Sequence, residues 1–295
     1  MRVIAIFGPT GVGKTEVAIA LAERLRADGE DPVAVSADAM QVYAGLPILT
    51  GAATTEQQRQ LEHRLLGVVA VSEPFSAGAY ARLAHGEIDA ALHAGRRPIV
   101  VGGTGLYLRA ALAELDLRPP VPEGRARWQA TLHERGPEAL HAELARRAPD
   151  VAQGIAPADG KRLVRTLELL DAGEAPPGGS QLWTTDTRHP TLLAGLVMDR
   201  AVLAERIGER VDRMVADGAF AEVERAAATA SPTARKALGF EELLAGDVEA
   251  MKARTRRYAK RQLTWMRKLP AVRTLDVTGR DPADVAAELH GMIEP

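Results

Sequence analysis

The chain has 295 residues, of which 46% are hydrophobic and 26% are charged, and its formal net charge is −2. This composition is typical of a globular protein with a buried core, and the charge argues against a uniformly basic coat for nucleic acid. The chain contains no cysteine, which excludes disulfides and thiolate metal sites.

The N-terminal segment predicts a strand–loop–helix–strand unit. Residues 2–7 (RVIAIF) indicate a buried strand, 14–25 have apolar residues at helical spacing, and 32–36 (PVAVS) indicate a second strand. The first apolar run is too short for a signal peptide, and no run of about 18 apolar residues occurs. We therefore expect a cytoplasmic protein that does not span a membrane.

The loop between the first strand and the first helix reads GPTGVGKT, from Gly8 to Thr15. It matches the P-loop pattern, in which backbone amides and the helix N-terminus bind phosphate oxygens. In this pattern Lys14 contacts phosphates and Thr15 can ligate Mg²⁺. The loop predicts a phosphate site but does not say what happens to the phosphate.

Two further segments follow predicted strands. A P-loop ATPase would show a strand that ends in Asp, whereas the strand at 99–101 ends in GGTG, which includes Thr104. Asp38, in SADAMQVY, could be a Mg²⁺ partner, a general base or a helix cap. Taken alone, GGTG reads as a glycine turn with a capping threonine. Because strand ends meet at one edge of a parallel sheet, we expect these segments to converge with the P-loop.

The middle of the chain predicts an inserted lobe. RPPVPEG, at 118–124, is a proline-rich hinge, 125–172 indicates helices, and APPGGS, at 175–180, is a second flexible stretch before a strand at 191–198. The predicted fold class is α/β, with a P-loop NTPase-like core, a parallel sheet and helices on both faces. The predicted domains are a core at 1–116 and 190–295, with a basic C-terminal helix, and an inserted helical lobe at 117–189.

Basic residues gather in three places. Arg206, Arg210 and Arg213 share one helix flank, which is either a solvated face or a face turned toward phosphates. Residues 252–268 hold eight basic residues with Tyr258 and Trp265 among them. This pattern fits an RNA backbone with unstacked bases, or a solvated helix with its aromatic residues in the core. A smaller basic group is Lys161, Arg162 and Arg165.

Six segments in order resemble those of the tRNA dimethylallyltransferases, also called tRNA isopentenyltransferases. They are GPTGVGKT, SADAMQVY, PIVVGGTGLYLRA, RIGERVDRMVADG, RKALGFEEL and YAKRQLTWMRK. The resemblance implies transfer of a dimethylallyl group from its diphosphate to the exocyclic amine of an adenosine beside the tRNA anticodon. The diphosphate would leave whole, and the implied partners are the tRNA anticodon stem-loop, dimethylallyl diphosphate and Mg²⁺, with the protein a monomer.

The resemblance also implies residue roles. Asp38 would be the general base, Thr104 would contact the bridging oxygen of the diphosphate, and Arg210 would neutralise the leaving group. The implied diphosphate-binding residues are Thr10, Gly11, Gly13, Lys14 and Thr15, with Thr15 as the metal ligand. The implied tRNA-binding residues are Asp38, Ala39, Met40, Gln41, Arg125, Lys161, Arg162, Arg165, Lys260, Arg261, Gln262, Trp265 and Arg267.

The segment after Tyr43 departs from the common bacterial pattern. The serine usual after the aspartate is Ala39, and of the lysine and paired histidine expected further on the chain keeps only His63. This segment is similar to relatives that prenylate free adenine nucleotides. An adenylate dimethylallyltransferase is therefore an alternative. Two alternatives from other classes are a P-loop small-molecule kinase and an RNA-binding module that uses the basic segment without catalysis.

Overall fold

The computed structural model describes residues 2–119, 121–176 and 181–293, and it divides into two compact units. The first comprises Met1–Leu115 and Leu182–Pro295, and the second comprises Asp116–Gln181. The two predicted flexible stretches, RPPVPEG and APPGGS, lie partly outside the described residues, at 120 and 177–180.

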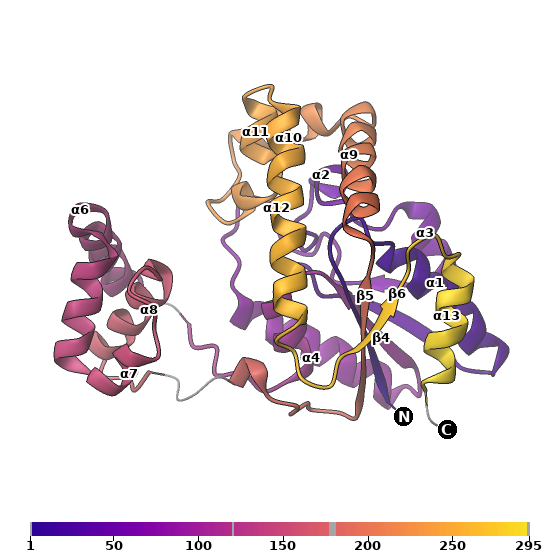
Figure 1. Cartoon of the computed structure of the whole chain (residues 1–295), viewed down its shortest axis with the longest axis horizontal. Coiled ribbons are helices and arrows are strands. Elements are labelled where there is room, and N and C mark those ends of the chain that lie inside the picture. The colour runs from indigo at the N-terminus through magenta and orange to yellow at the C-terminus, as the bar shows by residue number, and fades with distance from the viewer. Residues whose placement is uncertain (1, 120, 177–180, 294–295) are drawn as a thin grey trace. The chain divides into compact units, whose positions relative to one another are not determined.

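A six-stranded parallel sheet forms the centre of the first unit (Figure 1). Its order is β3-β2-β4-β1-β5-β6, so the strand before the P-loop lies between β4 and β5. The register pairs Ile4 of β1 with Ile99 of β4 and with Leu192 of β5. The strands are β1 (Val3–Phe7), β2 (Pro32–Ser36), β3 (His63–Arg64), β4 (Arg97–Gly102), β5 (Thr191–Val197) and β6 (Arg273–Asp276). The predicted parallel sheet is confirmed.

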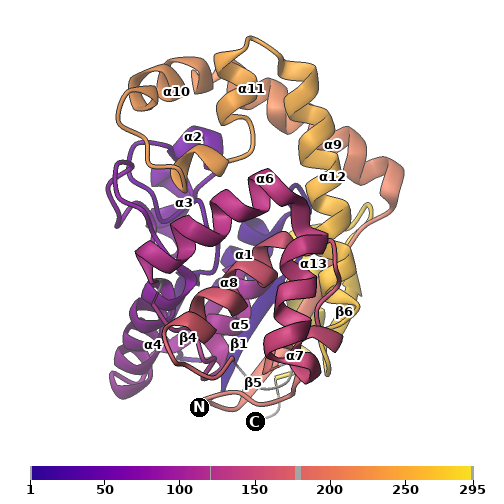
Figure 2. The same ribbon diagram turned by 90° about the vertical axis from the view of Figure 1, so that its left-hand side faces the viewer.

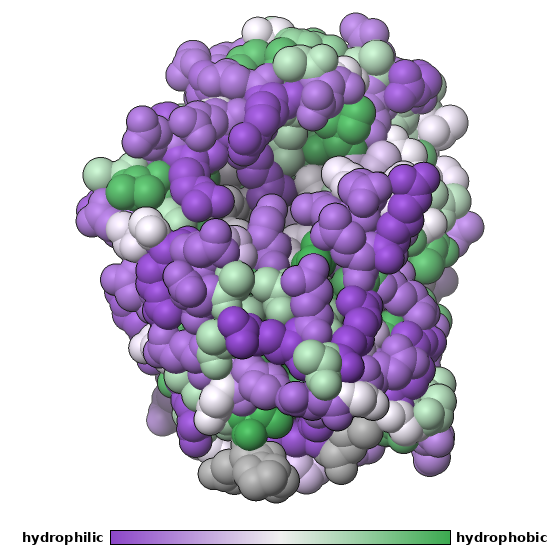
Figure 3. All heavy atoms as spheres, turned by 90° about the vertical axis from the view of Figure 1, so that its right-hand side faces the viewer, coloured by the Kyte–Doolittle hydropathy of each residue, from purple (hydrophilic) through white to green (hydrophobic). Residues whose placement is uncertain are grey.

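Helices cover both faces of this sheet. α1 (Lys14–Ala27) and α13 (Pro282–Gly291) pack together on one face, and α4 (Ala77–His93) and α5 (Gly105–Leu112) pack together on the other. β1 and β2 are buried along their whole length, as expected for strands covered on both sides. The outer surface on the α13 side is mainly hydrophilic, with hydrophobic residues in small separate groups (Figure 3). Across residues 2–119, 121–176 and 181–293, no helix has the length and apolar content needed to cross a bilayer.

The remaining helices of the first unit stand largely beyond the carboxyl ends of the strands (Figure 1). The two longest, α9 and α12, pack against each other, and each carries one of the basic segments. The set comprises α2 (Pro47–Thr50), α3 (Thr55–Gln60), α9 (Arg200–Ala216), α10 (Ala219–Ala227), α11 (Phe240–Leu244), α12 (Val248–Met266), and the short 3₁₀ turn η2 (Ala234–Lys236). A second 3₁₀ turn, η1 (Gln181–Trp183), begins at the last residue of the second unit.

The second unit is a helical bundle with its own core (Figure 2). It contains α6 (Pro122–Arg147), α7 (Pro149–Gln153) and α8 (Gly160–Asp171). Gly136, at φ 76°, breaks α6 just before Pro137. Leu140 and Leu144 of α6 are fully buried against Leu163 and Leu167 of α8. This burial explains why a segment of mostly polar composition folds.

The return from the second unit to the first occurs earlier than the predicted boundary at 189. Residues 182–189 belong to the first unit because their side chains pair with its helices. The rings of Trp183 and Trp265 lie 4.6 Å apart, and Arg188 donates a 2.8 Å hydrogen bond to Asp89 of α4. The short strand β6, four residues long, was not predicted either.

Candidate active site

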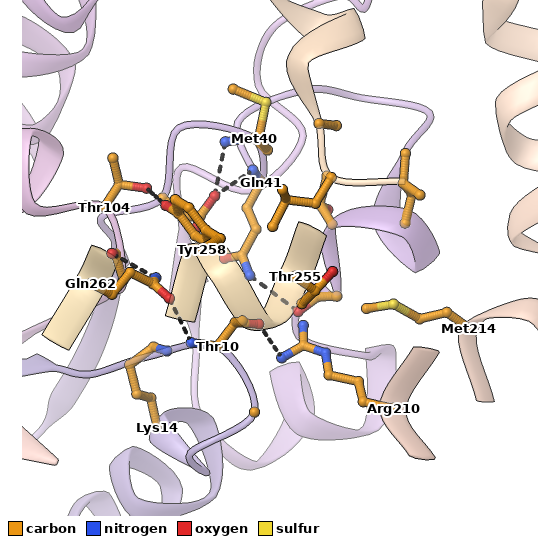
Figure 4. A pocket seen from close by; sticks show the side chains of 18 of the residues that line it. Thr10, Lys14, Met40, Gln41, Thr104, Arg210, Met214, Thr255, Tyr258 and Gln262 are labelled. Carbon is orange, nitrogen blue, oxygen red and sulfur yellow. Dashed lines mark hydrogen bonds between the residues drawn. The ribbon is translucent and has the colours of Figure 1, made fainter. Parts of the chain in front are cut away.

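A pocket of about 530 Å³ opens at the carboxyl ends of the strands in the first unit. The P-loop after β1, the segment after β2 and the turn after β4 all contribute to its wall, which confirms that these segments converge. α9 and α12 supply further lining residues (Figure 4). The predicted residues that line the pocket are Thr10, Gly11, Gly13, Lys14, Thr15, Asp38, Ala39, Met40, Gln41, Thr104, Arg210, Arg261 and Gln262.

The ammonium group of Lys14 is held by carbonyl oxygens of its own loop. Its Nζ donates hydrogen bonds to Gly8 O at 3.0 Å and to Pro9 O at 2.9 Å. Burial and the nearby charge of Arg210 lower the pKa of Lys14 to about 8, and Asp38 opposes this shift. A cation that burial disfavours is stabilised when an anion binds beside it.

Arg210 of α9 places a second cation in the pocket. Its Nη1 donates a 3.2 Å hydrogen bond to Thr10 Oγ1, and burial lowers its pKa (Figure 4). No carboxylate lies within ion-pair distance of it in the described part of the chain. Arg206 and Arg213 also line the pocket but are exposed. This helix flank was predicted to be either a solvated face or a face turned toward phosphates, and the second prediction fits Arg210.

Asp38 follows β2, and its carboxylate is held at one oxygen. Oδ1 accepts a 2.8 Å hydrogen bond from the Met40 amide and a 3.4 Å bond from the Gln41 amide. Within the described residues no partner contacts Oδ2. The Gln41 side chain in turn donates to Gly51 O at 3.1 Å, which fixes the loop after α2 beside it. One carboxylate oxygen is therefore left to accept a proton or hydrogen bond from a ligand.

The hydroxyl of Thr104 lies in a small polar network. Its Oγ1 accepts a long 3.4 Å hydrogen bond from the Ala39 amide and lies 3.2 Å from the Tyr258 hydroxyl (Figure 4). Burial, with the charge of Asp38, raises the pKa of Tyr258 to about 12, so this phenol keeps its proton at neutral pH. If Tyr258 donates to Thr104, both acceptor positions of Thr104 are filled and its own proton is left for a ligand.

One part of the pocket wall is apolar. These side chains come from α2, α9, α12 and the segment between η2 and α11, and they are Leu49, Val211, Met214, Leu238 and Met251. Met214 points toward the pocket from α9 (Figure 4). The pocket therefore combines cations, a carboxylate and an apolar surface that could take a short hydrocarbon chain.

Only some of the basic residues in the segment 252–268 lack an acidic partner in the fold. Lys252 pairs with Asp212 at 2.7 Å, and Arg254 pairs with Glu242 at 2.7 Å. The remaining basic residues are exposed and have no carboxylate partner among the described residues: Arg256, Arg257, Lys260, Arg261, Arg267 and Lys268. The prediction that this helix binds RNA therefore depends on these six side chains.

The side chains of two residues that were predicted to bind tRNA point into the protein instead. Gln262 is 4% exposed, and both ends of its amide are bonded inside the protein. The ring of Trp265 is tilted at 50° against that of Trp183, and it packs over Gly105 at the start of α5. The helix has two faces, and these side chains lie on or beside the inner one.

In the second unit, two predicted RNA-binding arginines have a partner. Glu168 is fully buried and accepts a 3.1 Å hydrogen bond from Arg125 and a 2.7 Å bond from Arg165. Arg162 lies 3.6 Å from Asp159, and Lys161 is exposed. A buried carboxylate must be paired to be tolerated, so Arg125 and Arg165 stabilise this unit whatever else they contact.

Sequence reasoning missed several residues that shape the pocket, among them Gly51, Tyr258 and the inward role of Gln262. Tyr258 and Gln262 are four residues apart, which is the spacing that places two side chains on one face of a helix. That spacing was the available signal, but the surrounding basic residues favoured an RNA surface instead.

The chain matches the family model described as IPP transferase over residues 41–269. It is 42% identical to a tRNA dimethylallyltransferase of Thermobifida fusca, over 97% of this chain and 93% of that protein. The full-length tRNA isopentenylpyrophosphate transferase of Bacillus halodurans is 32% identical, with a TM-score of 0.71 and coverage of 99% and 95%. A eukaryotic dimethylallyltransferase, described as acting on tRNA, is 26% identical, with a TM-score of 0.78 and coverage of 99% of this chain and 77% of that one.

Proposed function

This chain belongs to the IPP transferase family, and on that basis we propose that it is a tRNA dimethylallyltransferase. The reaction transfers the dimethylallyl group of dimethylallyl diphosphate to the exocyclic amine of an adenosine beside the tRNA anticodon. Diphosphate is released whole. The resemblance found in the six sequence segments is confirmed by the relatives that the chain matches over nearly its full length.

One observation supports the roles of the site residues most directly. Lys14 of the P-loop and Arg210 beside it have no carboxylate partner among the described residues, and their pocket also holds Asp38 and an apolar wall. Two partly buried cations would be costly in an empty protein, and a diphosphate offsets that cost. We propose that the apolar wall holds the hydrocarbon chain of the donor.

The chemistry follows from this arrangement. The allylic C–O bond breaks as diphosphate leaves, and a C–N bond forms to the adenine amine. Lys14 and Arg210 stabilise the charge that develops on the leaving group. The free oxygen of Asp38 accepts the amine proton, and the Thr104 hydroxyl donates to the bridging oxygen. When both substrates fill the pocket, exclusion of water would protect an allylic cation.

The pocket also fits a magnesium ion that enters with the substrate. In the described residues no cluster of three or more His, Asp or Glu side chains could hold a metal alone. Mg²⁺, however, is commonly bound by one or two protein oxygens together with substrate phosphates. Thr15 and Asp38 both line the pocket, and Thr15 is the proposed ligand. When bound, the ion would neutralise part of the diphosphate charge.

We propose that the outer face of α12 binds the tRNA. Lys260 and Arg267 are exposed there and are free of acidic partners within the described chain, and Arg261, also exposed, borders the pocket. The target adenine must leave the anticodon stack to reach the pocket, which costs only a few kcal/mol for a loop base. Roles for Lys161 and Arg162 of the second unit in the same interaction stay predictions, as do a monomeric state and a cytoplasmic location.

A labelling experiment tests this proposal. Dimethylallyl diphosphate labelled in its hydrocarbon chain is incubated with the protein and either total tRNA or AMP. We expect label in tRNA and none in AMP. Label in AMP alone would identify an adenylate dimethylallyltransferase instead. Consumption of ATP with a small alcohol acceptor, and no use of the allylic donor, would identify a kinase.

A further inference from the structure

Gln262 of α12 lies between the P-loop and the turn that carries Thr104. Its Oε1 accepts a 2.9 Å hydrogen bond from the Thr10 amide, and its Nε2 donates a 2.7 Å bond to the Gly103 carbonyl. Figure 4 shows the side-chain amide spanning these two turns. Because the residue is only 4% exposed, water has little access to either bond.

The partners fix the orientation of this amide. A backbone N–H can only donate, so Thr10 must face the oxygen of Gln262. A backbone carbonyl can only accept, so Gly103 must face the nitrogen. The approach at Gly103 is close, because a Cβ there would stand 2.3 Å from Gln262 Nε2. Only glycine at 103 leaves room for the amide at this place.

Both contacted residues adjoin groups of the proposed diphosphate site. Thr10 is hydrogen-bonded to Arg210, and Gly103 directly precedes Thr104. We propose that Gln262 is a positioning residue, which fixes the P-loop and the Thr104 turn at the separation that one diphosphate bridges. This inference rests on the proposed function, and it replaces the RNA contact expected for Gln262 from the sequence.

Gln262→Met tests the inference, because methionine has a similar size and makes neither bond. Both turns then lose their fixed partner, and a ligand must order them as it binds. We expect the affinity for inorganic diphosphate, measured by calorimetry, to fall by at least about tenfold. We expect kcat to fall as well, because Thr104 moves with its turn. Affinity for tRNA, measured without the allylic donor, should stay unchanged.

Met266→Leu is the matched control for a change in the packing of α12. Met266 lies one turn further along the same buried face and packs against Gly195, away from both turns of the pocket. We expect wild-type affinity for diphosphate in this variant. An equal loss of affinity in both variants would show that any disturbance of the helix weakens the site, and it would overturn the specific role of Gln262.

The pH dependence of diphosphate affinity in Gln262→Glu distinguishes a hydrogen-bonding role from a packing role. A protonated carboxyl group can accept from Thr10 and donate to Gly103, as the amide does, whereas a carboxylate can only accept. Burial opposite a carbonyl raises the pKa of such a carboxyl group. We expect its diphosphate Kd, divided by the wild-type Kd at the same pH, to approach one as the pH falls from about 8 to about 5.5.

The outcomes separate this inference from the proposed function. Wild-type diphosphate affinity in a folded Gln262→Met protein would overturn the positioning role. Where that variant does not fold, a Gln262→Glu ratio that is independent of pH overturns it instead. If the wild-type protein binds diphosphate but labels neither tRNA nor AMP, the proposed function fails, and the diphosphate affinities still decide the role of Gln262.

Discussion

The guanidinium of Arg210 occupies the space where a side chain at position 51 would begin. A Cβ on Gly51 would stand 1.8 Å from Arg210 Nη2, and the Gly51 backbone is left-handed, at φ 57°. The glycine therefore makes room for the cation, and its carbonyl also accepts the bond from Gln41. Arg210 can reach Thr10 only because position 51 has no side chain.

Gly51→Ala is expected to displace Arg210 from the P-loop. Without that charge beside the leaving group, kcat/KM for dimethylallyl diphosphate should fall by about 100-fold, a typical loss for one electrostatic contact to the transition state. Steady-state kinetics with tRNA at saturation measures this. Gly45→Ala is the control, because Gly45 is also left-handed, at φ 85°, but has no atom within 4 Å of the built Cβ. Both variants carry backbone strain of about 1–2 kcal/mol, so equal activity losses would contradict the role given to Arg210.

The lowered pKa of Lys14 predicts opposite effects of pH on stability and on binding. Lysine in an unfolded chain has a pKa near 10.4, and Lys14 in the fold has one of about 8. Between these values the unfolded chain binds more protons, so stability of the empty protein rises with pH there. A bound diphosphate favours the charged amine, so affinity should fall above about pH 8 by up to tenfold per pH unit.

Calorimetry of inorganic diphosphate between about pH 7 and pH 9.5 measures this dependence. Lys14→Arg is the comparison, because arginine stays charged over the whole range. The variant is expected to bind more weakly but with a flatter dependence on pH, and the ratio of the two affinities removes the ionisation of the ligand itself. Parallel curves for the two proteins would show that Lys14 does not titrate at the site.

Asp38→Asn is expected to remove the general base while the fold is kept. The amide oxygen can still accept from the Met40 amide, as Oδ1 does now at 2.8 Å, so the turn should persist. Loss of the proton acceptor should lower kcat by about 100-fold or more, with tRNA affinity little changed. Single-turnover transfer and a separate tRNA-binding measurement distinguish the two effects. Full activity in this variant would remove Asp38 from the chemistry.

Tyr258→Phe tests how the Thr104 hydroxyl is oriented. The phenol lies 3.2 Å from Thr104 Oγ1, and without it the threonine proton can turn away from the ligand. We expect kcat to fall by about tenfold with a small change in KM for the donor, since only one neutral hydrogen bond is lost. Thr104→Val should give a larger loss. If the double variant is no worse than Thr104→Val, the phenol acts through the threonine.

The core of the fold could be predicted from local patterns, and the details of the site could not. The P-loop, its flanking strand and its helix are contiguous, so their periodicity and glycine spacing suffice. β6 lacks such a signal because only Leu275 of its four residues is buried. The pairing of Arg125 with Glu168 spans 43 residues and appears only when α6 packs on α8. In the same way, the inner face of α12 is defined by α5, α9 and the turns after β1 and β4, which lie far from it in the sequence.

Charge reversal on the outer face of α12 tests the proposed tRNA surface. Lys260→Glu with Arg267→Glu removes two exposed cations that have no carboxylate partner among the described residues, so no ion pair of the fold is lost. If each cation meets a phosphate, affinity for tRNA should fall by at least about tenfold at about 0.1 M salt, and the dependence of affinity on salt should become shallower. Arg24→Glu with Arg26→Glu, both exposed on α1, changes the net charge equally and should leave tRNA binding nearly unchanged. Filter binding over a range of salt concentrations measures both pairs, and equal losses in the two proteins would mean that overall charge, rather than this face of α12, attracts the RNA.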